Sequence, residues 1–149
     1  MESFSQRDPR WAAAKLGQSP LTIGRYGCTT TCIANLSTYF GDNLNPLQIS
    51  QAIKYTPDGL VLWPSCKFAR FAFWFREYGR NETNIKNALA DPNLAVILQV
   101  ANGTHWVVVT GKPNFFNRHF KIADPWFGDR SDMRRYGDSI TGAAYFKKI

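Results

Sequence analysis

The stretch Ile23–Cys32, IGRYGCTTTC, places two glycines before a cysteine and small or β-branched residues after it. From this cysteine onward, apolar residues recur at the three-to-four-residue spacing of one helix face: Cys28, Cys32, Leu36 and either Tyr39 or Phe40. Gly41 follows the last of them, in a position suited to ending a helix. The spacing therefore predicts a buried helix from Cys28 to Phe40 whose first residue carries a thiol.

A thiol at the start of a helix has a chemical use. The amino terminus of a helix offers unpaired N–H groups and a partial positive charge, both of which favour the nucleophilic thiolate. Gly27 removes side-chain bulk, which would let a substrate carbonyl approach the thiol and the N–H of Cys28. We therefore expect Cys28 to be a nucleophile. Cys32 and Cys66 are expected in the core, because cysteine is among the most frequently buried residue types.

A nucleophile needs a base, and the chain has two histidines, His105 and His119. His105 opens a predicted strand directly after a turn, and Trp106 beside it would screen the site from water. Asp124 ends a later predicted strand, where antiparallel pairing would bring it next to His105. The order Cys28, His105, Asp124 thus predicts a catalytic triad. His119 is expected to face solvent from a strand.

The remaining patterns predict helices first and an antiparallel sheet afterwards. Further helices are expected over three ranges: Asn45–Ile53, Ser65–Tyr78 and Asn81–Ala90. Strands are expected over four ranges: Leu94–Val100, His105–Thr110, Phe116–Ile122 and, at an edge, Ala143–Lys148. Asn102-Gly103 tolerates positive φ and would join the first two strands in a hairpin. This order defines an α+β domain.

Composition favours one globular domain spanning residues 1–149, since 44% of the residues are hydrophobic and 15% are aromatic. The amino terminus lacks the pattern of a signal peptide, and no apolar run approaches the roughly 18 residues of a membrane span. An odd set of three cysteines favours free thiols in a reducing compartment. We expect a monomer that is cytoplasmic, or released to the cell wall by a route without a signal peptide.

The formal net charge of +7 favours anionic surroundings. Nucleic acid, an anionic cell-wall polymer and a membrane surface all carry the required charge, and its sign alone does not choose among them. We expect a peptide or peptidoglycan as the partner rather than nucleic acid.

Other interpretations of the same residues are weaker. Zinc-ligand types occur at Cys28, Cys32, Cys66 and His105, but without a paired Cys-x2-Cys spacing. The aspartates of DPWFGDRSD, at positions 124, 129 and 132, lack the spacing of a calcium loop. Without Cys28, His105 would be interpreted as a hydrogen-bonded core histidine and Asp124 as a turn cap. We expect neither a metal nor a cofactor.

The sequence resembles the papain-fold cysteine peptidases related to the double-glycine leader peptidases that mature bacteriocins. The resemblance covers nearly the whole chain and depends on the order of five segments: QRDPRW (6–11), GRYGC (24–28), GLVLW (59–63), THWVVV (104–109) and DPW (124–126). It implies a papain-like fold, with amino-terminal helices packed on a carboxy-terminal antiparallel sheet.

The resemblance also implies roles for individual residues. Cys28 would attack a peptide carbonyl to form a thioester, His105 would carry the proton and Asp124 would orient His105. Gln6 corresponds to the glutamine of the oxyanion hole. In the leader peptidases that glutamine lies closer to the cysteine, whereas here residues 15–23 intervene, and Gln18 is the alternative.

Two functions follow as hypotheses. The first is a cysteine hydrolase that cleaves peptide or amide bonds. Leader peptidases usually form the front part of a membrane transporter, so a free-standing basic domain is expected instead to act on anionic cell wall in a bacterium or its phage. A peptidoglycan cross-bridge, a stem peptide and a protein leader remain open as substrates. The second is a non-catalytic module that binds an anionic polymer such as cell wall or nucleic acid.

Overall fold

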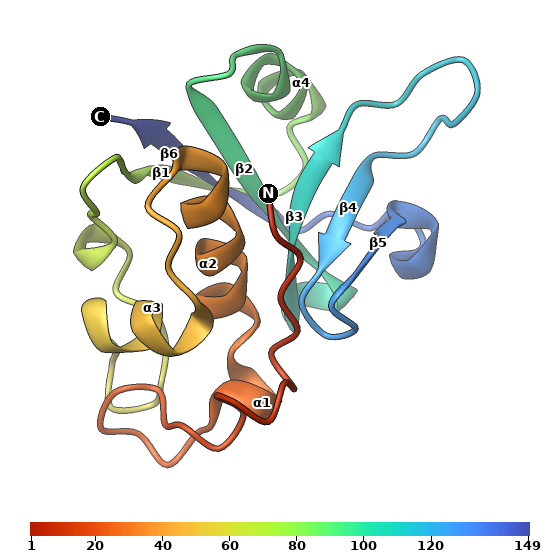
Figure 1. The fold of residues 1–149 in the computed structure, drawn as a ribbon. Helices are drawn as coiled ribbons and strands as arrows, with labels where there is room; N and C mark the ends of the chain where they lie inside the picture. Colours follow the sequence, from red (N-terminus) through yellow and green to blue (C-terminus); the bar gives the residue numbers. More distant parts are fainter.

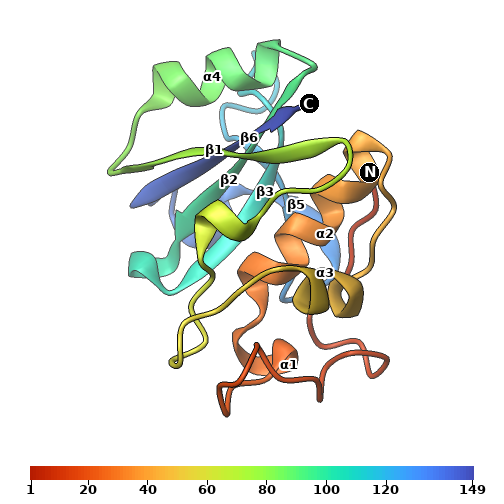
Figure 2. The ribbon, with the colours of Figure 1, turned by 90° about the vertical axis from the view of Figure 1, so that its left-hand side faces the viewer.

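A computed structural model describes residues 1–149 and shows helices on both faces of a six-stranded antiparallel sheet (Figures 1 and 2). The strands are β1 (Phe71–Tyr78), β2 (Leu94–Val100), β3 (His105–Gly111), β4 (Lys121–Asp124), β5 (Asp129–Asp132) and β6 (Gly142–Lys148). The α-helices are α1 (Ile23–Tyr26), α2 (Cys28–Phe40), α3 (Pro46–Ala52) and α4 (Glu82–Ala90), and 3-10 turns lie at Trp63–Ser65, Ala101–Gly103 and Met133–Tyr136. The α+β fold is confirmed and is compatible with a papain-like peptidase.

The strand order in the sheet is β1-β6-β2-β3-β4-β5. Figure 2 shows α1, α2 and α3 on one side of this sheet and α4 on the other. Side chains of β2 alternate between the two layers: Val96 and Leu98 pack with the α4 side, and Ile97 packs with the α2 side. Because both faces are covered, β2 is a continuous apolar run from Leu94 to Leu98, and such a run is recognisable in the sequence.

Local signals set the ends of the helices as predicted. Helix α2 begins at Cys28 and ends at Gly41, which adopts φ 95° and donates its N–H to the carbonyl of Ser37. Helix α3 starts with a reciprocal capping box between Asn45 and Gln48. Helix α4 begins after the cap residue Asn81. The hairpin joining β2 to β3 also forms, with Asn102 and Gly103 at positive φ.

The helix predicted over Ser65–Tyr78 is wrong, because Phe71–Tyr78 is strand β1, paired with β6. The register of this pair shifts between Phe73 and Phe75, so a bulge interrupts the two-residue alternation. As a result Phe73 packs on the α2 side of the sheet and Phe75 on the α4 side. The bulge produced an aromatic spacing that imitates a helix, although aromatic residues favour strands.

Three features of the sheet also differ from expectation. Strand β4 starts at Lys121 rather than Phe116, because Asn114 and Asn117 form a turn that leaves Phe116 exposed. Strand β6 lies between β1 and β2 rather than at an edge. Strand β5 was not predicted. Its pairing with β4 is what places Asp124 and Asp129 opposite each other.

The three cysteines are free thiols. No group of three or more histidine, cysteine or acidic side chains is close enough together to hold a metal ion. None of the helices has the length and hydropathy needed to span a membrane.

Candidate active site

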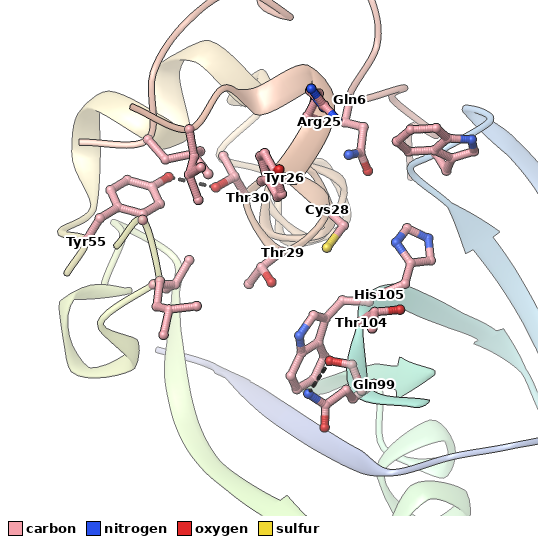
Figure 3. Close-up of a pocket in the computed structure, with 18 of the residues that line it drawn as sticks. Gln6, Arg25, Tyr26, Cys28, Thr29, Thr30, Tyr55, Gln99, Thr104 and His105 are labelled. Atoms are coloured by element: carbon pink, nitrogen blue, oxygen red, sulfur yellow. Dashed lines mark hydrogen bonds between the residues drawn. The ribbon is translucent and has the colours of Figure 1, made fainter. Parts of the chain in front are cut away.

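A cleft of about 600 Å³ opens where the start of α2 meets the start of β3 (Figure 3). Cys28 and His105 both line it, and Gln6 lies at the same end. Trp126 and Tyr136 border this end from the segments around β5. Cys28 and His105, 77 positions apart along the chain, are thus brought to one opening.

Cys28 is 9% exposed and is the first residue of α2, as predicted. The glycine in front of it has a packing role. A Cβ on Gly27 would lie 2.6 Å from the carbonyl oxygen of Ile23 and 2.7 Å from its Cα. Gly27 therefore makes room for α1 to pack against the start of α2.

Cys32 and Cys66 are core residues, with exposures of 0% and 1%. The thiol of Cys32 donates to the carbonyl oxygen of Trp106 at 3.4 Å. This contact joins the second turn of α2 to the second residue of β3. Burial raises the pKa of the Cys32 thiol well above its usual value, and it raises the pKa of Cys66 to about 12.

The pairing of β3 with β4 brings His105 and Asp124 together. Val108 lies opposite Ala123 in this antiparallel pair. The same register places Asp124 opposite Val107, and His105 lies two residues before Val107 on the same face of the sheet. His105 and Asp124 are therefore diagonal neighbours whose side chains can reach each other. The imidazole Nε2 of His105 lies 2.9 Å from Oδ1 of Asp124. The other ring nitrogen, Nδ1, does not bond Asp124 and is available to groups in the cleft, where Cys28 lies.

Asp124 is fully buried and hydrogen-bonded through both oxygens. Besides His105, its Oδ1 accepts from the N–H of Trp126 at 3.0 Å. Its Oδ2 accepts from the hydroxyl of Tyr136 at 2.5 Å and from Arg135 at 3.1 Å. Burial alone would raise the pKa of this carboxyl, but the hydrogen bonds from His105 and Tyr136 outweigh it and lower the pKa to about 2.

The pKa of His105 shifts in the opposite direction to that of Asp124. Burial lowers the pKa of its imidazole, but hydrogen bonding and the negative charge of Asp124 and Cys28 outweigh burial and raise the pKa to about 9. Figure 3 shows the thiol of Cys28 and the imidazole of His105 facing each other across the cleft. At neutral pH the ring is therefore an imidazolium.

The model of the peptidase C39 family matches residues 22–136. The chain belongs to the peptidase C39 family. This is the family of cysteine peptidases that process double-glycine leaders of bacteriocins, so the resemblance found in the sequence is confirmed. No curated protein and no solved structure matches the chain. Membership in the C39 family supports a cysteine peptidase acting on peptides, and the match includes Cys28, His105 and Asp124.

Gln6 lies outside the C39 match, yet the fold returns it to the cleft. Its backbone N–H donates to the carbonyl of Pro125 at 2.8 Å, which ties the amino-terminal segment to the turn after Asp124. Its side chain is 1% exposed; Nε2 donates to the carbonyl of Gly24 at 3.3 Å, while Oε1 has no partner. Gln18 is exposed and does not line the cleft. The intervening residues 15–23 loop out and close on themselves through the Lys15–Thr22 bridge.

Tyr136 and Arg135 were missed in the sequence. They belong to a 3-10 turn after β5, and Arg135 also binds Asp129 at 2.8 Å. No motif marks them, because their contact with Asp124 depends on the unpredicted strand β5. His119, expected in a strand facing solvent, lies outside any strand, is half-buried and bonds Asp138 at 2.8 Å, away from the cleft lining.

Proposed function

We propose that this C39-family protein is a cysteine peptidase in which Cys28 is the nucleophile, His105 the general acid and base, and Asp124 the residue that orients His105. One observation carries the proposal: Cys28 and His105 line the same cleft, and His105 is held 2.9 Å from a buried carboxylate. A nucleophile, a base and an orienting group in this order make up the triad arrangement.

The chemistry starts from an ion pair. An imidazolium at position 105 favours a thiolate at its side, and the amino terminus of α2 adds a partial positive charge. The sulfur of Cys28 attacks the carbonyl carbon, and the carbonyl electrons move onto oxygen. When the tetrahedral intermediate collapses, the C–N bond breaks and the amine leaves with a proton from His105 Nδ1. A water molecule, deprotonated by His105, then cleaves the thioester and restores the thiolate.

Asp124 keeps the imidazole in a productive orientation throughout. Because its Oδ1 accepts from Nε2, the Nδ1 edge remains the one that exchanges protons in the cleft. Four hydrogen bonds hold the carboxylate itself in place. Asp124 therefore acts through His105, as a positioning residue.

The oxyanion of the tetrahedral intermediate needs donors. The N–H of Cys28 is among the first N–H groups of α2, which have no partner within the helix. The Nε2 of Gln6 has a second hydrogen beyond the one it donates to Gly24. These two donors would converge on an oxygen bound at the Cys28 end of the cleft.

Replacing Gln6 with alanine is expected to lower kcat by about 100- to 1,000-fold, the usual effect of losing one oxyanion donor. The Gln18→Ala variant is the matched control, because the exposed Gln18 does not line the cleft. Steady-state kinetics with thermal unfolding measured alongside would check this. Wild-type kcat in a folded Gln6→Ala protein, or loss of activity in Gln18→Ala, would contradict the assignment.

The charges of the residues that line the cleft also indicate which substrates it would bind. No acidic side chain lines it, and Arg25 at its rim is exposed and outside every ion pair, whereas Arg135 is neutralised by Asp124 and Asp129. Unpaired positive charge beside the nucleophile favours a peptide with a carboxylate close to the scissile bond. Stem peptides of peptidoglycan have this chemistry, and we propose them ahead of protein leaders.

The function is tested by digesting three substrates with wild type and Cys28→Ala: purified peptidoglycan, a peptide library and a double-glycine leader peptide. Mass spectrometry should find new carboxyl termini with wild type alone, enriched next to acidic residues. Cleavage by both proteins would refute Cys28 as nucleophile. Salt-sensitive binding to cell wall with no cleavage of any substrate would instead favour the non-catalytic binding module.

A further inference from the structure

The loop between β3 and β4, residues 112–120, projects away from the body of the protein (Figure 1). At its tip Phe115 and Phe116 are 83% and 94% exposed, with their rings edge to face and 5.5 Å between centroids. Adjacent exposed rings on a projecting loop are unfavourable in water, and apolar surface of this kind marks an interaction site.

The turn at the tip is ordered by its own hydrogen bonds. The side-chain Oδ1 of Asn114 accepts from the backbone N–H groups of Phe116 and Asn117, both at 2.9 Å. The N–H of Asn114 donates to the carbonyl of Asn117 at 2.7 Å. This Asn-capped turn fixes the backbone that presents the two exposed rings.

The loop and its neck carry unpaired positive charge. Lys112, Arg118 and Lys121 are all exposed, and none takes part in an ion pair. Lys121 lies opposite Gly111 in the sheet, which places Lys112 and Lys121 together at the neck of the loop.

Two acidic side chains contact this region. Asp132 forms an ion pair with Arg134 at 2.8 Å, and Asp138 is hydrogen-bonded to His119 at 2.8 Å. The loop therefore combines an apolar tip with three cations that belong to no ion pair.

We propose that the 112–120 loop docks the protein on an anionic phospholipid surface, with Phe115 and Phe116 entering the interface and the three cations meeting lipid phosphates. Aromatic rings favour the headgroup region, and basic residues next to it gain from the negative surface potential. A convex tip enters a fluid bilayer without a matching cavity, whereas a folded protein or a glycan would need a complementary groove. The geometry therefore favours lipid.

The loop lies at the end of β3 opposite His105. Strand β3 has seven residues, so its ends are about 20 Å apart at roughly 3.3 Å per residue. Docking by the loop would leave the cleft open to solvent and to substrate. The proposal thus stands independently of the peptidase function.

The experiment is sedimentation of the purified full-length chain with vesicles of phosphatidylcholine, alone or mixed with phosphatidylglycerol. Wild type should bind the mixed vesicles and be released by salt. The Phe115→Ala/Phe116→Ala variant should bind at least about tenfold more weakly, because both apolar anchors are lost. Phe116→Trp should retain binding. Tyr78→Ala, which removes an 82%-exposed aromatic on β1, is the matched control and should bind like wild type.

Each readout has a result that overturns the proposal. Failure of wild type to bind the mixed vesicles would do so, as would equal binding by the double phenylalanine variant. Sedimentation with purified peptidoglycan that depends on the two phenylalanines, without vesicle binding, would assign the loop to the polymer instead. Cleavage of a soluble peptide should be equal in wild type and the double variant, so a missing peptidase activity does not affect this test.

Discussion

Replacing Cys28 with alanine is expected to lower kcat by at least about 10⁴-fold while the protein stays folded, because no other group in the cleft can form the thioester. Cys28 is the one cysteine that lines the cleft. Its side chain is small, so its loss costs little packing. Single-turnover and steady-state assays on a cleaved peptide, with thermal unfolding as the fold check, would measure the effect.

Two controls sharpen this prediction. Cys32→Ala removes a thiol one helical turn away and should retain activity, at some cost in stability because Cys32 is buried. Iodoacetamide should modify Cys28 first and abolish activity, since the buried Cys32 and Cys66 have raised pKa values and little access. A Cys28→Ala protein that still turns over substrate would end the peptidase proposal at this site.

The second large effect is expected from Asp124→Asn, which should lower kcat/KM on the order of 10³- to 10⁴-fold by removing the negative charge that orients His105 and stabilises its protonated form. The pKa of His105 is raised to about 9, so wild-type activity should fall as pH rises through about 9, where the ring loses its proton. In Asp124→Asn this alkaline limb should move to lower pH. If Asp124 had a purely structural role, Asp124→Asn would lower activity without shifting the alkaline limb of the pH–activity profile.

The same pair of groups predicts how stability depends on pH. A raised pKa on His105 stabilises the fold fully below its ordinary value near 6.5, and this contribution is lost as pH rises through about 9. A lowered pKa on Asp124 stabilises the fold above its ordinary value near 3.8, and this contribution is lost as pH falls through about 2. Thermal unfolding of Asp124→Asn should lack the acid dependence and show a weaker alkaline dependence, because Cys28 also raises the pKa of His105, whereas Gln18→Ala should show both unchanged.

Several parts of the fold were predictable because their signals are local. Helix α2 has an apolar stripe and the terminator Gly41, and helix α3 has Asn45 and Pro46 at its start. The β2–β3 hairpin is specified by two apolar runs around Asn102-Gly103. In each case neighbouring residues supply the hydrogen bonds or the backbone conformation that the element needs.

Other parts escaped prediction because their partners are distant. Phe71–Tyr78 is a strand only because β6, more than sixty residues later, supplies its hydrogen bonds, and the bulge within it hid the alternation. The carboxy-terminal strand β6 lies inside the sheet rather than at its edge for the same reason, since β1 and β2 pair with it from both sides. Local periodicity cannot report on pairing of this kind.

By itself, the sequence determined that a thiol begins a buried helix, that a histidine begins a strand after a tight turn, and that the chain is α+β, since these follow from short-range spacing. Only the tertiary structure decided the surroundings of the candidate site. Gln6 returns to the cleft through Pro125, and Tyr136 and Arg135 reach Asp124 through β5. The physical reason is that a buried carboxylate must find all its hydrogen-bond partners in space, and sheet pairing, rather than sequence distance, decides which residues those are.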